Sequence, residues 1–266
     1  MKKILLISAI TVLFLILVSS TASASSVTRI TLNTADQWNP SIWSNYIVWV
    51  DTRNTGSDIY LQNLATKVQT RVTSGVYAEN PFVSGNRIVW DDWRNENPDI
   101  YMYEISTKKT TRITLNTAYQ INPCVYGNLI VWEDTRNGGS SIYLQNLATK
   151  VQTRISTNGY EPAIYGNKIV WYSKDDGGYI IHLYDINTKK TSTILKDDSI
   201  SDLSLYGNRI MYNYVSDGAG TRMYDFVTKK YINLPIGYLE SPKFYSNKVV
   251  YTDTKYGNRD IFMATI

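Results

Sequence analysis

The chain has 266 residues and contains 27 Lys and Arg, 23 Asp and Glu, one His and one Cys. A single Cys excludes an intramolecular disulfide framework, and one His with one Cys leaves zinc sites and His-dependent nucleophilic catalysis without their usual side chains. The formal net charge of +4 is too small to indicate a nucleic acid or an anionic membrane as partner, because both need a concentrated basic face.

The N-terminus has the pattern of a secretory signal peptide. Two Lys at positions 2 and 3 are followed by an apolar run from Ile4 to Val18 and by the small residues Ala22-Ser23-Ala24. The run is shorter than the about 20 residues of a membrane-spanning helix. We therefore expect cleavage after Ala24, so that 1–24 is the signal peptide and 25–266 is one exported domain. That domain would be secreted or held at the cell surface, with no integral membrane segment. The alternative is an uncleaved N-terminal anchor.

The rest of the chain repeats one unit six times. The triplet Ile-Val-Trp, or a close relative of it, recurs with its third residues 41, 42, 39, 41 and 39 positions apart. These third residues are Trp49, Trp90, Trp132, Trp171, Tyr212 and Tyr251. A fixed period near 40 residues in a β pattern is typical of the blades of a propeller.

Each unit resolves into four short strands separated by turn residues. In the second unit the strands are predicted at Phe82–Ser84, Arg87–Asp92, Asp99–Tyr103 and Thr111–Thr114. The fourth-strand motif also precedes the first unit, at Thr28–Thr31, whereas the last unit ends at its third strand, Asp260–Met263. We therefore expect a closed ring in which the N-terminal strand completes the last blade, because closure removes exposed sheet edges.

The order of motifs resembles the TolB-like six-bladed β-propeller repeat. The motifs are a Pro-led inner strand, a tight turn, Ile-Val-Trp, Asp-x-Arg-Asn, Asp-Ile-Tyr and Arg-Ile-Thr. The resemblance covers nearly all of Val27–Ile266, and the closest look-alikes are the propeller repeats of cell-surface proteins of methanogenic archaea. It implies an all-β fold, a six-bladed β-propeller of four-stranded antiparallel blades. It implies little about activity, because this fold serves unrelated functions.

The Asp-x-Arg-Asn motif lies in the loop from the second to the third strand. Its charged residues are Asp51 and Arg53, Asp92 and Arg94, and Asp134 and Arg136. We interpret each as an Asp–Arg pair that fixes its loop. The alternative is a set of ligand contacts on one face. The motif is lost in the later units, which argues against a six-fold symmetric site but leaves a one-sided site open.

Other conspicuous residues have structural interpretations. His182 occupies the position of Tyr60 and Tyr101 in other units and is expected to pack, and Cys124 is expected to be a small buried hydrophobe. The lysines of the turns from the third to the fourth strand are expected to form a solvated rim; the alternative is attraction to an acidic cell-wall polymer. They are Lys67, Lys108, Lys109, Lys150, Lys189, Lys190, Lys229 and Lys230.

The candidate binding surface is the ring of residues directly before the inner strands, which line the channel. One polar residue from each unit falls there: Asn39, Asn80, Asn122, Glu161, Asp202 and Ser241. The same loops carry flat amphipathic side chains that suit sugars or peptides: Trp38, Tyr77, Tyr119, Tyr160 and Tyr238. The polar ring either folds the loop before a proline and binds channel water, or forms a ligand site helped by a hard cation such as calcium at Glu161 and Asp202.

The sequence therefore predicts a monomeric, non-catalytic binding or scaffold propeller at the cell surface or envelope. It would recognise a protein or a glycan through the loop face at the channel mouth, with no cofactor other than the calcium just considered and no nucleic acid as partner. The alternative is an enzyme that cleaves a polysaccharide or a peptide. The mouth offers carboxylates for such chemistry, but no His or Cys to work with them.

Overall fold

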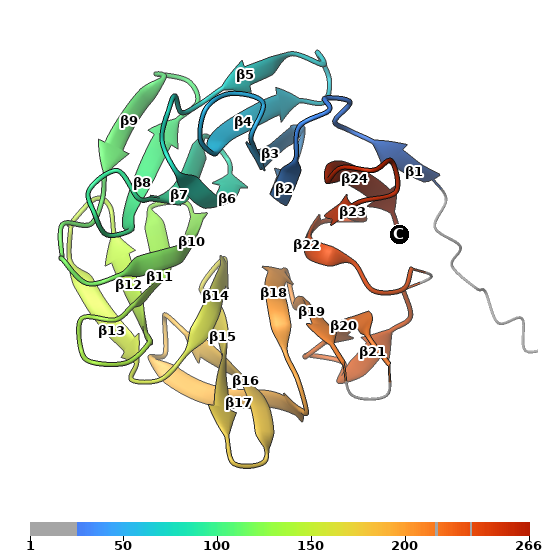
Figure 1. The fold of residues 1–266 in the computed structure, drawn as a ribbon. Coiled ribbons are helices and arrows are strands. Elements are labelled where there is room, and N and C mark those ends of the chain that lie inside the picture. The colour runs from blue at the N-terminus through green and yellow to red at the C-terminus, as the bar shows by residue number, and fades with distance from the viewer. Residues whose placement is uncertain (1–25, 216–217, 235) are drawn as a thin grey trace, which may run out of the picture.

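The computed structural model describes residues 26–215, 218–234 and 236–266. These residues form 24 strands in six four-stranded antiparallel sheets, which Figure 1 shows as blades around a central axis. The predicted six-bladed all-β propeller is therefore confirmed. Among the described residues, no helix has the length and apolar character needed to cross a membrane. The predicted signal peptide, residues 1–24, lies outside the described residues, and its cleavage stays a prediction.

Each blade runs from an inner strand at the axis to a fourth strand at the rim. The first blade comprises β2 (Gln37–Trp43), β3 (Tyr46–Asp51), β4 (Asp58–Asn63) and β5 (Gln69–Arg71), and the second β6 (Ala78–Ser84), β7 (Arg87–Asp92), β8 (Asp99–Glu104) and β9 (Lys109–Arg112). The third comprises β10 (Gln120–Tyr126), β11 (Leu129–Asp134), β12 (Ser141–Asn146) and β13 (Gln152–Ser156), and the fourth β14 (Tyr160–Tyr165), β15 (Lys168–Asp175), β16 (Gly178–Asp185) and β17 (Lys190–Asp197). The fifth comprises β18 (Ser201–Tyr206), β19 (Arg209–Tyr214), β20 (Gly220–Asp225) and β21 (Lys230–Ile232), and the sixth β22 (Glu240–Tyr245), β23 (Lys248–Asp253), β24 (Asp260–Thr265) and β1 (Ser26–Arg29). The fourth strands begin one or two residues earlier than predicted.

The second strand of each blade is apolar on consecutive residues because a blade is covered on both faces. In β3, Val48 and Val50 pack in one core cluster with Trp90 of the next blade. Trp49, whose side chain points to the opposite face of the strand, packs in another cluster with Val250 of the preceding blade. All five side chains are fully buried. The Ile-Val-Trp triplet therefore joins each blade to both of its neighbours.

The N-terminal strand closes the ring as predicted. β1 pairs antiparallel with β24, in a register that sets Ser26 opposite Thr265. Arg29 forms an ion pair with the fully buried Asp260, at 2.7 Å, and the Thr31 hydroxyl donates a hydrogen bond to the same carboxylate at 3.1 Å. The first and last strands of the fold, blue and red in Figure 1, therefore lie side by side in one sheet.

The Asp-x-Arg-Asn loops contain the expected Asp–Arg pairs. In the first blade, the fully buried Asp51 accepts hydrogen bonds from the Trp49 indole at 2.9 Å and from Arg53, whose Nη2 is 2.6 Å away. The Arg53 guanidinium lies over the Tyr60 ring, 4.3 Å from its centroid. The second and third blades repeat this arrangement at Asp92 with Arg94 and at Asp134 with Arg136.

The fourth blade replaces this arrangement with uncharged residues. Ser173 stands where the first three blades have the aspartate, and His182 stacks on Trp171 with ring centroids 5.3 Å apart. The Ser173 hydroxyl and His182 Nε2 are 2.8 Å apart. Burial lowers the pKa of His182, so the ring is neutral near pH 7 and packs as the tyrosines do.

Candidate functional site at the channel mouth

A β-bulge in each inner strand positions the candidate site. The six polar residues were predicted directly before the inner strands, but they lie within them, because each strand begins one or two residues before the polar residue and continues through the bulge. The register between first and second strands shifts at this point in every blade, and one residue per blade adopts a positive φ of 45–57°. Those residues are Asn39, Asn80, Asn122, Glu161, Asp202 and Ser241. In five of the six blades a proline follows, and proline suits a bulge because it has no N–H to pair in the ladder. The bulge turns each of these side chains towards the axis.

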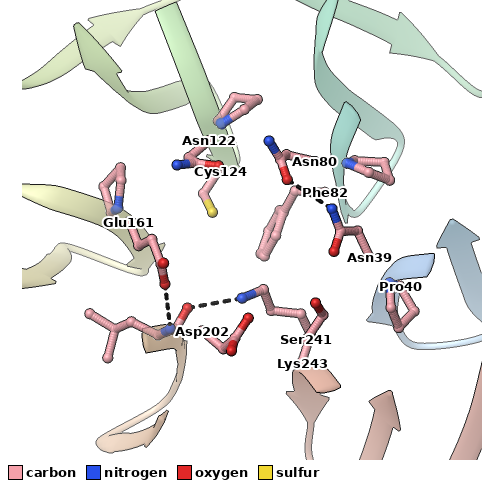
Figure 2. Close-up of a pocket in the computed structure, with 14 residues that line it drawn as sticks. Asn39, Pro40, Asn80, Phe82, Asn122, Cys124, Glu161, Asp202, Ser241 and Lys243 are labelled. Carbon is pink, nitrogen blue, oxygen red and sulfur yellow. Dashed lines mark hydrogen bonds between the residues drawn. The ribbon is translucent and has the colours of Figure 1, made fainter. Parts of the chain in front are cut away.

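All six bulge residues line one cavity of about 110 Å³ on the propeller axis. Figure 2 shows their side chains around it, with Phe82, Cys124 and Lys243 pointing in among them. The structure thus brings together the whole predicted polar ring. The cavity is smaller than the roughly 300–1,000 Å³ of sites that enclose a drug-sized ligand. It has room for a side chain, for the end of a longer ligand or for a few water molecules.

Amides form one half of the ring and are linked in series. Asn39 Nδ2 donates a hydrogen bond to Asn80 Oδ1 at 3.0 Å, and Asn80 Nδ2 donates to Asp91 Oδ1 at 3.0 Å. Asn122 donates twice, from its backbone N–H to Asp91 at 3.1 Å and from Nδ2 to Glu133 Oε1 at 2.6 Å. Asp91 and Glu133 lie on the second strands and are almost fully buried. They hold the asparagine side chains in fixed orientations.

Acidic and basic side chains form the other half. Glu133 Oε1 accepts a hydrogen bond from the Glu161 backbone N–H at 2.6 Å, and Glu161 Oε2 accepts one from the Leu203 N–H at 3.0 Å. Lys243 Nζ donates to the Leu203 carbonyl at 3.1 Å. The ammonium and the Glu161 carboxylate therefore contact the same residue from two sides, as the dashed lines in Figure 2 show. Asp202 accepts a hydrogen bond from the Asn213 amide at 2.9 Å.

Burial changes the acidity of these carboxyl groups. Loss of solvent raises the pKa of Asp91 to about 7 and the pKa of Glu161 to about 7, although the charge of Lys243 opposes the rise at Glu161. Burial also raises the pKa of Glu79 and of Glu133. The mouth therefore holds carboxyl groups that exchange protons near neutral pH, a property that is common at functional sites and also occurs in structural networks.

Sequence reasoning missed three residues that line the cavity and two that support it. Lys243 and Phe82 occupy the position two residues after the bulge, where other blades have Ser41, Cys124, Ala163 and Ser204. A lysine at that position of an inner strand was the available signal. Cys124 was predicted to be buried, and it is, but it also lines the cavity; burial raises the pKa of its thiol to about 12. Asp91 and Glu133 could have been found by the same alignment of the second strands.

The predicted aromatic residues lie outside the cavity, on the loops of the same face. Tyr77, Tyr119 and Tyr238 are about half exposed or more. Tyr160 stacks on Tyr172, with ring centroids 5.6 Å apart, and the Trp38 indole donates a hydrogen bond to Glu79 at 2.9 Å. Trp93, which no motif had singled out, is 40% exposed and packs edge-to-face against Tyr119. An aromatic surface therefore adjoins the cavity without lining it.

The residues at the mouth offer oxygen ligands for a hard cation but do not form a compact acidic cage. Within the described part of the chain, no three His, Cys, Asp or Glu side chains lie close enough to hold a metal ion together. A cation at Glu161 and Asp202 would need amide or carbonyl oxygens as further ligands, and the Lys243 ammonium points into the same cavity. Calcium binding stays a prediction.

Comparison of the sequence with known families identifies the repeat. The chain matches the family model of the TolB beta propeller domain over residues 21–234, which is well over half of its length. No curated protein sequence matches the chain.

Solved structures share the fold at low sequence identity. TolB from Acinetobacter baumannii has a TM-score of 0.64 and 21% identity, over 80% of this chain and 58% of that one, so this chain spans less than two thirds of that protein. An oligogalacturonate lyase in complex with manganese has a TM-score of 0.61 and 12% identity, over 92% and 94%. An acylaminoacyl peptidase from Pyrococcus horikoshii has a TM-score of 0.62 and 13% identity, over 87% and 46%. Likeness at these identities establishes the fold and leaves the activity open.

Proposed function

We propose that this chain, which belongs to the TolB β-propeller family, is a non-catalytic binding or scaffold module that recognises a protein or a glycan at its channel mouth. One observation carries the proposal. Six polar bulge residues, one from each blade, surround a single cavity of about 110 Å³. Polar groups that converge on a concave site are the usual means by which a protein orients a ligand.

The size of the cavity limits how much of such a ligand can enter it. The cavity accepts one terminal group, such as a peptide side chain or the last unit of a glycan. Lys243 offers an ammonium donor, and Asn39 and Ser241 offer oxygen acceptors. The rest of the ligand lies across the exposed aromatic loops, where Tyr77 and Tyr119 provide flat surfaces for sugar rings or peptide groups.

The proposed location is the cell envelope or the cell surface. The predicted signal peptide supports export, and the similarity to TolB supports an envelope setting. The repeat form resembles that of surface proteins of methanogenic archaea, which supports a role at the cell surface.

An enzyme that cleaves a polysaccharide or a peptide is the second candidate. The observation that favours it is the raised pKa of Glu161, about 7, because a carboxyl group of that acidity inside a cavity can serve as a general acid or base. The lyase and peptidase propellers described above have the same fold. Against it, Glu161 Oε2 already accepts the Leu203 N–H, and its charge is balanced by Lys243.

Binding to an array of glycans and peptides, followed by mass spectrometry of the incubated ligands, tests the proposal. We expect at least one class to bind wild type, to bind Lys243→Met more weakly, and to be recovered unchanged. Recovery of cleaved ligand would show that the protein is an enzyme instead. Loss of that cleavage in Glu161→Gln would then identify Glu161 as the general acid or base. Failure of every class to bind would contradict both candidates.

A further inference from the structure

The face opposite the mouth consists of turns and is strongly basic. Backbone hydrogen bonds join its inner and outer turns within each blade, for example from the Leu64 N–H to the Asn45 carbonyl at 2.7 Å and from the Ile105 N–H to the Asn86 carbonyl at 2.9 Å. We call it the basic face. Its inner turns are 43–46, 84–87, 126–129, 165–168, 206–209 and 245–248, and its outer turns are 63–69, 104–109, 146–152, 185–190 and 225–230.

The small net charge of the chain hides a separation of charge between the basic face and the rest of the chain. The basic face carries twelve Lys and Arg against three acidic side chains, Glu104, Asp185 and Asp225, which gives a net charge of +9. The rest of the chain from residue 25 carries 13 Lys and Arg and 20 Asp and Glu, a net charge of −7. Nine of the twelve cations are exposed and the other three are half-buried. The cations come from all six blades: Lys67, Arg87, Lys108, Lys109, Lys150, Lys168, Lys189, Lys190, Arg209, Lys229, Lys230 and Lys248.

Aromatic side chains occupy the centre of the basic face. Trp43, Tyr126, Tyr165, Tyr206 and Tyr245 end the inner strands of five different blades. The Trp43 ring contacts three of them across the axis, with centroids 5.9 Å from Tyr126, 6.2 Å from Tyr165 and 4.9 Å from Tyr245. All five are half-buried, so the cluster closes this end of the channel and still meets solvent.

Apolar side chains stand beside the lysines at the tips of the outer turns. Val68, Val151 and Val227 are each about 60% exposed. Two of them directly follow a lysine and the third precedes one by two residues. Exposed valines next to flexible cations, with Trp and Tyr at the centre, combine the side chains that proteins place at the boundary between water and lipid.

We propose that the basic face docks on an anionic phospholipid bilayer. Its cations are spread over the whole circumference, and this matches a planar charged surface better than a linear polyanion, which would follow a single basic groove. Each Lys or Arg near such a surface raises the affinity about fivefold. The mouth face then points away from the membrane, with its cavity open to ligand.

The point at which the chain enters the propeller fits this orientation. β1 begins at Ser26 opposite Thr265, and the neighbouring Ile266 N–H donates to the Asn247 carbonyl of the last inner turn at 2.8 Å. The chain therefore joins the fold on the basic face, and seven residues separate Ser26 from the end of the apolar run Ile4–Val18. If the predicted signal peptide stays uncleaved as an N-terminal anchor, it would hold this same face against the bilayer.

Sedimentation with vesicles tests the proposal on residues 25–266, which contain all six blades and the closing strand. The probes are vesicles of phosphatidylcholine alone and vesicles that contain about one third phosphatidylglycerol. We expect binding to the anionic vesicles only, and release when the salt is raised to about 0.5 M, because the screening length then falls well below the about 8 Å of physiological salt. No binding to anionic vesicles, or equal binding to both, would overturn the proposal.

Two matched triple variants assign the binding to this face. The first variant removes three exposed cations of the basic face by the substitutions Lys108→Asn, Lys189→Asn and Lys229→Asn. Asn tolerates the positive φ of 55–57° at these positions. We expect binding to weaken about 100-fold. The control, Lys174→Gln, Lys196→Gln and Lys255→Gln, removes three exposed cations elsewhere and should leave binding unchanged. Equal weakening in both variants would contradict docking by the basic face.

Binding of soluble heparin without vesicle binding would identify a polyanion as the partner instead. Neither outcome depends on the ligand of the mouth.

Discussion

The carboxylate of Glu161 in the fourth blade accepts a hydrogen bond from the backbone N–H of Leu203 in the fifth blade, at 3.0 Å. The same kind of link recurs around the mouth, because Asp91 accepts the Asn122 N–H and Glu133 accepts the Glu161 N–H of the following blade. Three acids therefore join four successive blades. These acids lie beside the polar ring that faces the cavity. The residues that shape the candidate site therefore also hold neighbouring blades of the propeller together.

This arrangement predicts that stability falls as the pH rises towards neutrality. Burial raises the pKa of Glu161 from 4.5 to about 7 and that of Asp91 from 3.8 to about 7. Between about pH 4 and pH 7 the folded protein keeps these two protons, whereas the unfolded chain releases them. The contribution of the two carboxyl groups to the free energy of unfolding is therefore complete below about pH 4 and is lost as the pH rises through about 7. A shift of one pKa unit corresponds to about 1.4 kcal/mol. The two groups together should therefore lower the free energy of unfolding by several kcal/mol over this pH range.

Urea unfolding at about pH 5 and about pH 8 measures this effect. Wild type should have the lower free energy of unfolding at the higher pH, and Asp91→Asn/Glu161→Gln should reduce the difference, because amides keep hydrogen-bonding capacity without titrating. The surface acids Asp175, Asp185 and Asp225, which accept hydrogen bonds in the folded protein, have lowered pKa values. They change stability in the opposite direction at lower pH, outside this range. An unchanged pH dependence in the double variant would refute the assignment.

Closure of the ring depends on one buried charge. Asp260 is fully buried and pairs with Arg29 of the N-terminal strand at 2.7 Å. Arg29→Met should lower the free energy of unfolding by about 3 kcal/mol, because it leaves a buried carboxylate without its partner. The double variant Arg29→Met/Asp260→Asn should recover part of the loss. Deletion of residues 25–32 should cost more, because strand pairing is lost as well; a truncated chain that melts like residues 25–266 would show that β1 does not close the ring.

The third blade offers a matched pair of arginines. Arg136 pairs with the fully buried Asp134 at 2.6 Å. Arg154, on the fourth strand, is exposed. In the first, second and sixth blades the arginine at this position pairs with a buried Asp that opens the third strand, but in the third blade Ser141 takes the place of that Asp. Arg136→Met should destabilise the protein by about 3 kcal/mol, and Arg154→Met by no more than about 0.5 kcal/mol. Thermal unfolding of the two variants measures the contrast. Equal shifts would mean that the loop pair adds nothing to stability.

Calcium binding can be separated from the rest of the site by calorimetry. The predicted ligands Glu161 and Asp202 share the cavity with Lys243. If calcium binds, the heat should appear at about pH 8, where Glu161 is ionised, vanish in Glu161→Gln/Asp202→Asn, and grow in Lys243→Met, which lacks the competing positive charge. Absence of heat with wild type and with Lys243→Met would end the calcium hypothesis.

Much of the fold could be predicted because each unit carries the same local signals. The Ile-Val-Trp strands, the tight turns and the offset fourth strand predict six blades and a closed ring. In one of these turns Gly85 has a positive φ of 59°, a conformation that glycine adopts without strain. The polar ring could also be predicted, because a polar residue recurs near the start of the inner strand in every unit, with a proline after it in five of them. The bulge within the strand, which turns each of these residues towards the axis, has no such signal.

The unpredicted features depend on contacts between different blades. Asp91 and Glu133 reach across to the next blade, and Lys243 enters the cavity from a position where other blades have small or apolar residues. These residues differ from blade to blade, so the repeated motifs do not mark them, and only a comparison of the strands position by position reveals them. The lysines of the outer turns were predicted to share one rim, but the net charge of the whole face was not. The low net charge of the chain is an average, and it hides the excess of cations in the turns of the basic face.

The most direct measurement for the central claim is the affinity of the mouth for the ligand that binds best on the array. It should be compared among wild type, Lys243→Met and the control Lys255→Met, which changes an exposed lysine away from the cavity. Binding at the mouth predicts a loss of at least about tenfold in Lys243→Met, because a charged hydrogen-bond donor contributes about 1.5–3 kcal/mol, and no change in Lys255→Met. Equal affinity in all three proteins would contradict recognition at the channel mouth.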